Sequence, residues 1–208
     1  MSKPALEVEV KFFLTDLHSF EKRVRSIGAV LVRPRTREVN YRFDTPDMKL
    51  SKERRVLRLR QDASTLLTYK GPAQANDSVS VRPEIELEVN DFMAASDLLE
   101  ALGFQLNVKY EKWRTIYQLD DLEITLDEMP FGNFTEIEGG EPIAIQKTAS
   151  LLALDWNTRI LDSYLVLFDR LKTNIKLEVK DLTFEALKNL EFSPADLGVK
   201  VADTPLFL

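Results

Sequence analysis

Strict alternation of charged and aliphatic residues recurs along this chain and constrains its fold more than any other feature. The first such segment is Glu7-Val8-Glu9-Val10-Lys11. Successive side chains of a β-strand point to opposite faces, so this segment has one aliphatic and one ionised face. The pattern returns at Arg58-Leu59-Arg60, Glu84-Ile85-Glu86, Lys112-Trp113-Arg114 and Glu136-Ile137-Glu138. Some strands thus present carboxylates and others present cations, a combination that can bind a metal ion and a polyanion together.

Alternation and turn residues predict eight strands, and amphipathic spacing predicts four helices. The strands are expected near residues 6–13, 38–45, 55–61, 64–70, 82–89, 110–118, 121–127 and 133–138. The helices are expected near 16–27, 91–102, 141–153 and 157–170. Residues 1–171 form the expected domain, whereas 172–208 are an extension of unknown role. In this extension, 175–180 alternates like a short strand and 184–190 suggests a helical turn or two.

The first two helices indicate an internal repeat. Asp16 and Asp91 precede them, Gly28 and Gly103 follow them, and both spacings are 75 residues. Each helix follows an E-x-E strand, which suggests two β-α-β-β-β halves. Closing the eight strands into a barrel would remove exposed sheet edges. We therefore expect an α+β fold with a closed eight-stranded antiparallel barrel and helices packed outside. The alternative is an open sheet with helices on one side.

Composition excludes several classes of site. The chain has no Cys, one His and a net charge of −6. It therefore lacks thiolate ligands and the net basic footprint of non-specific nucleic-acid binding, so no nucleic-acid partner is expected. Any metal must bind oxygen ligands, which favours Mg²⁺ or Mn²⁺. We find no signal-peptide pattern and no apolar run long enough for a bilayer, so we expect a cytoplasmic protein without a membrane partner.

The direction of the ionised faces decides their chemistry. If the helices cover the aliphatic faces, the charged side chains line the barrel interior, where each needs a partner. The alternatives are charges that face solvent or pair only with one another. Clustered carboxylates bind hard cations, and Arg and Lys bind phosphate. The candidate inward acids are Glu7, Glu9, Glu84, Glu86, Asp127, Glu136 and Glu138; the bases are Lys11, Arg58, Arg60, Lys70, Lys112 and Arg114. Arg82 and Glu88 fit the same alternation.

Several further blocks accompany E-x-E-x-K in a fixed order. They are Tyr41-Arg42-Phe43-Asp44-Thr45, Leu57-Arg58-Leu59-Arg60, Thr68-Tyr69-Lys70-Gly71-Pro72, Arg82-Pro83-Glu84-Ile85-Glu86, Glu111-Lys112-Trp113-Arg114, Ile124-Thr125-Leu126-Asp127, the segment 132–139 and Asp162-Ser163-Tyr164-Leu165. With this ordered set, residues 6–168 resemble the CYTH superfamily. That family is named for class IV adenylate cyclases and thiamine triphosphatases and is also called the triphosphate tunnel metalloenzymes.

The resemblance implies Mg²⁺- or Mn²⁺-dependent chemistry on a triphosphate inside an eight-stranded antiparallel tunnel. The implied catalytic residues are Glu7, Glu9, Lys11, Arg58, Arg60 and Glu136. The implied substrate-binding residues are Lys11, Arg58, Arg60, Lys70, Lys112 and Arg114. The implied metal ligands are Glu7, Glu9, Asp127, Glu136 and Glu138. The roles of Glu84 and Glu86 stay open.

Three functions fit these residues. The leading hypothesis is hydrolysis of inorganic triphosphate, thiamine triphosphate or a nucleoside triphosphate. The alternative is a class IV-type adenylate cyclase that converts ATP to cyclic AMP and pyrophosphate. The third is a non-catalytic module that binds polyphosphate or a nucleotide. The expected partner is a triphosphate-containing small molecule, and the expected state is a monomer or homodimer.

Overall fold

Eight strands and five α-helices make up the described part of this computed structural model, residues 5–72 and 78–203, with side chains described from Val8 onward. The strands are β1 (Ala5–Leu14), β2 (Val30–Asp44), β3 (Val56–Gln61), β4 (Thr65–Lys70), β5 (Ser80–Val89), β6 (Gln105–Leu119), β7 (Leu122–Met129) and β8 (Gly132–Glu138). The helices are α1 (Leu17–Ser26), α2 (Lys49–Lys52), α3 (Phe92–Ala101), α4 (Pro142–Leu151) and α5 (Tyr164–Ile175). None of these helices is long and apolar enough to cross a membrane.

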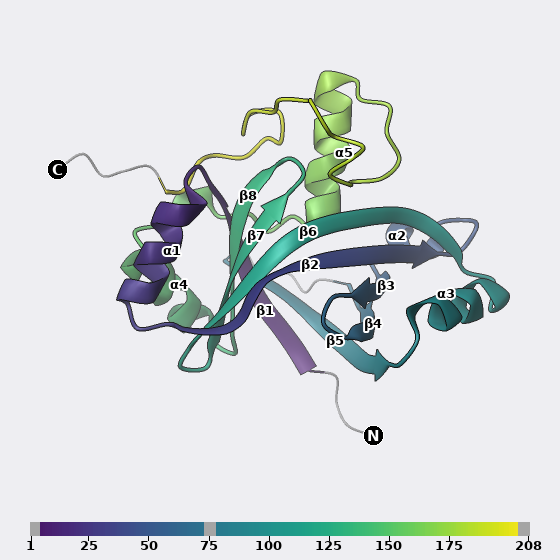
Figure 1. The fold of residues 1–208 in the computed structure, drawn as a ribbon, viewed down its shortest axis with the longest axis horizontal. Coiled ribbons are helices and arrows are strands. Elements are labelled where there is room, and N and C mark those ends of the chain that lie inside the picture. The colour runs from purple at the N-terminus through teal and green to yellow at the C-terminus, as the bar shows by residue number, and fades with distance from the viewer. Residues whose placement is uncertain (1–4, 73–77, 204–208) are drawn as a thin grey trace.

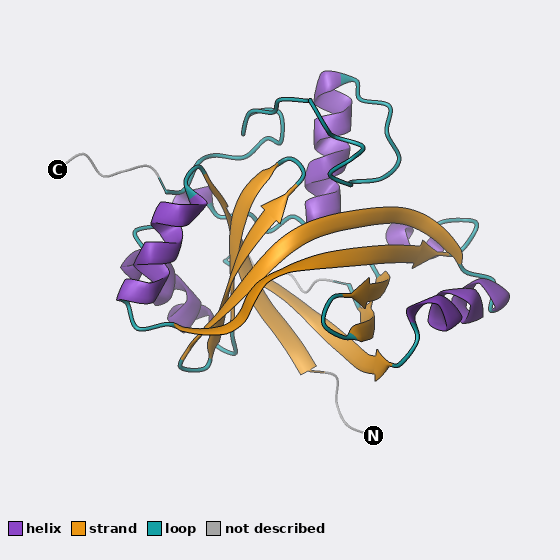
Figure 2. Ribbon diagram, in the orientation of Figure 1, coloured by secondary structure: helices purple, strands orange, loops and turns teal. Residues whose placement is uncertain are grey.

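The strands close into a barrel in the order β1-β5-β4-β3-β2-β6-β7-β8, and every neighbouring pair is antiparallel. Figures 1 and 2 show the helices on the outside of this ring. The predicted α+β barrel is thus confirmed. The 75-residue repeat also appears in the structure, because β1, α1 and β2 begin and end exactly 75 positions before β5, α3 and β6.

The apolar core lies outside the ring, so the ionised faces lie inside it. Phe12, Ile124 and Ile137 point outward from β1, β7 and β8 into one cluster, which α1 and α4 cover with Phe20 and Ile145. A smaller cluster packs the outward side chains of β2 and β3 against α3. Burying these apolar side chains contributes about 1.5–3 kcal/mol each, which fixes the inward direction of their charged neighbours.

A third cluster involves α5 and the chain that follows it. Phe13 and Phe134 extend from β1 and β8 to Tyr164, Leu167 and Phe168 of α5. The segment 177–201 completes this cluster with buried Leu182, Leu187 and Leu197, among others. Residues 177–201 of the extension are therefore packed against the barrel and α5, and Figure 1 shows this part of the chain beside α5.

Local structure departs from the sequence prediction in three places. The strand expected at 38–45 begins at Val30, because residues 30–37 also pair with β6 across β-bulges that accommodate Pro34. The helix expected at 157–170 begins at Tyr164, where the Ser163 hydroxyl accepts the Val166 N–H as an N-cap. The strand predicted at 175–180 is wrong: Ile175 ends α5, and residues 176–180 form no strand.

The β7–β8 hairpin depends on a glycine. Gly132 has φ +143°, and a Cβ there would lie 2.6 Å from the ring of Phe13. Any larger residue would push that ring out of the cluster beneath α5, so glycine permits the close approach of the hairpin to β1.

Candidate active site

A cavity of about 310 Å³ lies inside the barrel and is lined mainly by ionised side chains. Its basic lining residues are Lys11, Arg33, Arg42, Arg58, Arg60, Lys70, Arg82, Lys112 and Arg114; its acidic lining residues are Glu9, Glu84, Glu86, Glu123, Glu136 and Glu138. The basic side chains outnumber the acidic ones although the whole chain has a net charge of −6. The cavity is therefore a local site for an anion within an acidic protein.

The acidic wall is built by three neighbouring strands. Glu9 of β1 pairs in register with Glu138 of β8, and Glu138 pairs with Glu123 of β7. The next inward position of β1 is Lys11, whose Nζ lies 2.8 Å from Glu136 Oε1 and 3.9 Å from Glu9 Oε1. Burial alone would lower the pKa of Lys11, but the Glu136 and Glu9 carboxylates outweigh it and raise that pKa. Lys11 thus keeps its charge inside the barrel.

Asp127 holds two of the cations in place. Its carboxylate accepts hydrogen bonds from Arg114 Nε at 2.6 Å and from Lys112 Nζ at 3.1 Å. The Tyr164 hydroxyl at the start of α5 donates to the same carboxylate at 2.8 Å. Arg114 also contacts Glu136. Burial raises the pKa of Tyr164, and the Asp127 and Glu136 carboxylates raise it further, so the phenol stays a donor.

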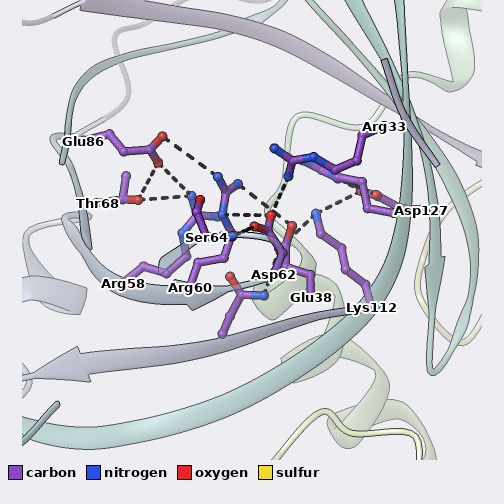
Figure 3. A network of polar contacts seen from close by, with 12 residues as sticks. Arg33, Glu38, Arg58, Arg60, Asp62, Ser64, Thr68, Glu86, Lys112 and Asp127 are labelled. Carbon is purple, nitrogen blue, oxygen red and sulfur yellow. Dashed lines mark hydrogen bonds and ion pairs between the residues drawn. The ribbon is translucent and has the colours of Figure 1, made fainter. Parts of the chain in front are cut away.

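The basic wall comes mainly from β2, β3 and β6, with further cations from β4 and β5, and Figure 3 shows part of its contacts. Arg58 and Arg60 lie 3.7 and 3.9 Å from Glu86. Behind them Glu38 lies fully buried, 3.6 Å from Lys112 and 3.9 Å from Arg60. Burial would raise the pKa of Glu38, but Lys112 and the surrounding arginines lower it to about 2. Glu38 is therefore an ionised counterion for the wall.

Four arginines that line the cavity have unsatisfied hydrogen-bond donors. The Nε atoms of Arg42, Arg58, Arg60 and Arg82 are buried and have no hydrogen-bond partner among the described residues. Arg42 and Arg82 also form no ion pair with any described carboxylate. Buried donors without a partner are rare and costly, typically about 1–3 kcal/mol each. These four groups point to an anionic ligand with several acceptor oxygens, which Arg forks match well.

The barrel brings most of the predicted site residues together. Glu9, Lys11, Arg58, Arg60, Lys70, Lys112, Arg114, Glu136 and Glu138 all line the cavity. Asp127 lies behind the lining, with its carboxylate engaged by Arg114, Lys112 and Tyr164. The side chain of Glu7 lies outside the described residues, although its backbone pairs with Arg82. Glu84 lies 3.6 Å from Lys70.

Sequence reasoning missed part of the site. Glu38, Asn40 and Arg42 also alternate along β2, but no role was predicted for them, even though Arg42 belongs to one of the matching blocks. Glu123 alternates with Asp127 on β7 and could have been found in the same way. Tyr164 also belongs to one of the matching blocks, but it is not part of an alternating strand, and its position in the site depends on how α5 packs against the barrel.

The donors suit Mg²⁺ or Mn²⁺ in their chemistry. Glu9, Glu136 and Glu138 carry carboxylate oxygens of the kind that these ions prefer, and carboxylates in register on adjacent strands repel one another unless a cation neutralises them. Among the described residues, no group of three or more acidic or histidine side chains converges closely enough to hold a metal by itself. Mg²⁺ commonly binds one or two carboxylates and completes its shell with substrate phosphates and water. The residues therefore fit a metal that binds together with a phosphate ligand.

Known proteins share this architecture. A relative from Methanocaldococcus jannaschii, whose name proposes an adenylate cyclase, is 29% identical over 64% of this chain and 76% of its own length. A Vibrio parahaemolyticus structure with a similar proposed name has a TM-score of 0.72 and 22% identity over 80% of this chain and 99% of its own. A Hippeastrum structure has a TM-score of 0.61 and 19% identity, covering 79% and 94% of the two chains. A model of the CYTH domain matches residues 5–156, so the chain belongs to the CYTH domain family.

Proposed function

We propose that this protein hydrolyses a triphosphate in a reaction that depends on Mg²⁺ or Mn²⁺. The observation that carries the proposal is the set of buried, unpartnered arginine donors in a cavity that also contains a row of carboxylates. The donors call for a polyanion, and a site for a polyanion alone would gain nothing from acids on the opposite wall. In a metal-bound triphosphate, the phosphate oxygens would accept from the arginine donors and the metal would neutralise the carboxylates.

The acidic wall is the proposed metal site. Glu9, Glu136 and Glu138 would hold the metal, together with phosphate oxygens and with Glu7 as implied by the family pattern. When bound, Mg²⁺ or Mn²⁺ would neutralise charge on the phosphoryl oxygens during the transfer. Asp127 is assigned a different role, because both of its oxygens already accept hydrogen bonds from Arg114, Lys112 and Tyr164. We infer that it positions these groups.

The basic side chains orient the phosphates. Lys11 supplies point charge, and Arg58 and Arg60 supply forked donors, on two sides of the cavity. Arg42 and Arg82 add Nε donors that have no hydrogen-bond partner in the described part of the chain. Phosphoryl transfer needs in-line positioning and stabilisation of the charge that spreads over the phosphoryl oxygens, and preorganised cations supply both.

The named relatives favour two related activities. The Hippeastrum neighbour is named as an adenylyl cyclase and has triphosphatase as its dominant activity. The Methanocaldococcus relative and the CyaB protein of Aeromonas hydrophila carry cyclase names. Adenylate cyclase, with release of pyrophosphate from ATP, is therefore the second candidate. For the first candidate, the triphosphatase, the substrates to compare are inorganic triphosphate, thiamine triphosphate and nucleoside triphosphates.

The test is a product analysis. The protein is incubated with inorganic triphosphate, thiamine triphosphate or ATP, each with Mg²⁺, with Mn²⁺ and with EDTA. Metal-dependent release of phosphate without cyclic AMP is the expected result. If cyclic AMP is the main product from ATP, the protein is an adenylate cyclase and the hydrolase proposal is wrong. Tight binding of all three compounds without any product would show a binding module instead.

A further inference from the structure

A second, larger chamber opens beside the tunnel. It has a volume of about 850 Å³ and lies between the α2–β3 region, the start of β6 and α5. Arg42, Val56, Arg82, Ser163 and Leu165 line both this outer chamber and the inner cavity. The two spaces therefore meet at a boundary that includes two of the arginines with unpartnered donors, and one extended ligand could occupy both.

The outer chamber is basic. Six cations line it, namely Arg42, Arg54, Arg55, Arg82, Lys172 and Lys180. Its two acids are already engaged: Asp162 lies 2.7 Å from Arg170, and Asp169 lies 2.8 Å from Lys172. Arg42, Arg54, Arg82 and Lys180 form no ion pair with a described carboxylate. Arg55 contacts Glu53 through its terminal nitrogen, but its Nε is buried without a hydrogen-bond partner among the described residues, like those of Arg42 and Arg82.

The outer chamber has no exposed aromatic ring among its described lining residues on which an aromatic ligand group could stack. The aromatic residues that line the chamber are Phe43 and Phe168, which are 2% and 1% exposed, so neither presents a ring face for stacking. Helix α5 also begins at the boundary between the chambers, next to Ser163 and Leu165, and the dipole of a helix favours negative charge near its N-terminus. Charge, free donors and the helix end all favour an anion over a planar base.

We propose that the outer chamber binds the phosphate groups that follow the third in a linear polyphosphate, so that the protein takes chains of four or more phosphates in preference to triphosphate. This proposal rests on the proposed function in one respect, namely that the inner cavity holds three phosphates. Arg42 and Arg82 then contact the chain where it leaves the cavity, and Arg54, Arg55 and Lys180 contact the phosphates beyond. A charge-assisted contact of this kind is worth about tenfold or more in affinity.

Binding without turnover tests the inference. Calorimetry in EDTA compares triphosphate, tetraphosphate, a longer linear polyphosphate and ATP on the intact protein. The variant is Arg54→Gln/Lys180→Gln, which changes two exposed side chains of the outer chamber only. The matched control is Lys22→Gln/Lys147→Gln, which removes the same charge from exposed positions on α1 and α4, at another side of the barrel (Figure 1).

Affinity of the unmodified protein should rise from triphosphate to the longer chains. The outer-chamber variant should bind the longer polyphosphate about tenfold more weakly and triphosphate within twofold of normal, and the control should change neither. Equal affinity of the unmodified protein for all chain lengths would overturn the inference. An equal loss of affinity for all chain lengths in the outer-chamber variant would also overturn it. A loss for ATP without a loss for polyphosphate would assign the chamber to an organic group. Because no metal is present, these outcomes do not depend on whether the protein hydrolyses triphosphate.

Discussion

Glu38 shows how this barrel keeps an ionised side chain away from water. It is 1% exposed, accepts a hydrogen bond from Asn40 at 2.9 Å and faces Lys112 and Arg60. A lone buried carboxylate would take up a proton, but the surrounding cations reverse that tendency and lower its pKa to about 2. The lowered pKa couples the stability of the fold to pH.

The pH dependence has a definite sign. The folded pKa of Glu38 lies below its ordinary value of 4.5, so its contribution is complete above about pH 4.5 and is lost as the pH falls toward 2. At pH 7 it is on the order of 3 kcal/mol. We expect Glu38→Gln to lower the free energy of unfolding by about that amount at pH 7, and the deficit should shrink between pH 5 and 2. Urea unfolding at a series of pH values measures it. A deficit that stays constant over this range would contradict the prediction.

Glu9 gives a prediction of the opposite kind, with a large effect on turnover and a small one on stability. Its neighbour in register is Glu138, so Glu9→Gln removes one of two adjacent negative charges. Metal-dependent turnover should fall by about 100-fold or more, because one proposed metal ligand is lost. The melting temperature should change by only a few degrees. Phosphate release across a Mg²⁺ titration measures the first effect, with Glu100→Gln, an exposed residue of α3, as control. Activity within a few-fold of normal would remove Glu9 from the metal site.

Much of the candidate site could be predicted from single residues, for a physical reason. Strand alternation fixes which side chains share a face, and the packed aliphatic face leaves the other to the cavity. Which of these side chains contact one another could not be predicted in this way. Glu38 meets Lys112 because β2 pairs with β6, and Tyr164 meets Asp127 because α5 packs at the end of the barrel. These contacts depend on topology and not on local spacing.

Among the elements, α5 and the chain after it determine whether Tyr164 reaches the site. The sequence predicted a helix there but placed it seven residues early, because the turn of 3-10 helix at Trp156–Thr158 resembles a helix start. For residues 177–201 the sequence suggested only part of a short strand and a helical turn or two, yet these residues bury several leucines against α5. Burial with few backbone hydrogen bonds leaves little periodic signal in a sequence.

Leu182 tests this packing. Its side chain is fully buried, its N–H donates to the Lys109 carbonyl, and its carbonyl accepts the Glu111 N–H. Leu182→Ala should lower the free energy of unfolding by about 2–5 kcal/mol, because it leaves a cavity between the extension and α5. Leu190→Ala is the matched control, since Leu190 is 42% exposed in the same segment, and it should cost well under 1 kcal/mol. Equal effects in urea unfolding would mean that the extension is only loosely attached.

On the scale of the whole molecule, the two repeats interlock. β1 of the first repeat pairs with β5 and β8 of the second, and β5 pairs with β1 and β4. β2 and β6 form the longest ladder between the repeats. Neither repeat can therefore pair all its strands by itself. The same interlocking makes the cavity, because its acidic wall comes from β1, β7 and β8, and most of its basic lining comes from β2 to β6, which belong to both repeats.

The interlocking predicts that the barrel unfolds as one unit and that a bound polyanion stabilises both repeats equally. Trp113 lies on β6, and Trp156 packs near Phe12 of β1, so Trp113→Phe and Trp156→Phe give separate fluorescence probes. Urea curves from the two variants should coincide in shape and steepness, whatever the small shift in midpoint that each substitution causes. Triphosphate in EDTA at about 100 times its dissociation constant should add about 2.7 kcal/mol to each. Arg58→Ala, made in either background, should weaken the binding and reduce that gain. A ligand effect on only one tryptophan would mean that the repeats unfold separately and that the ligand contacts a single wall.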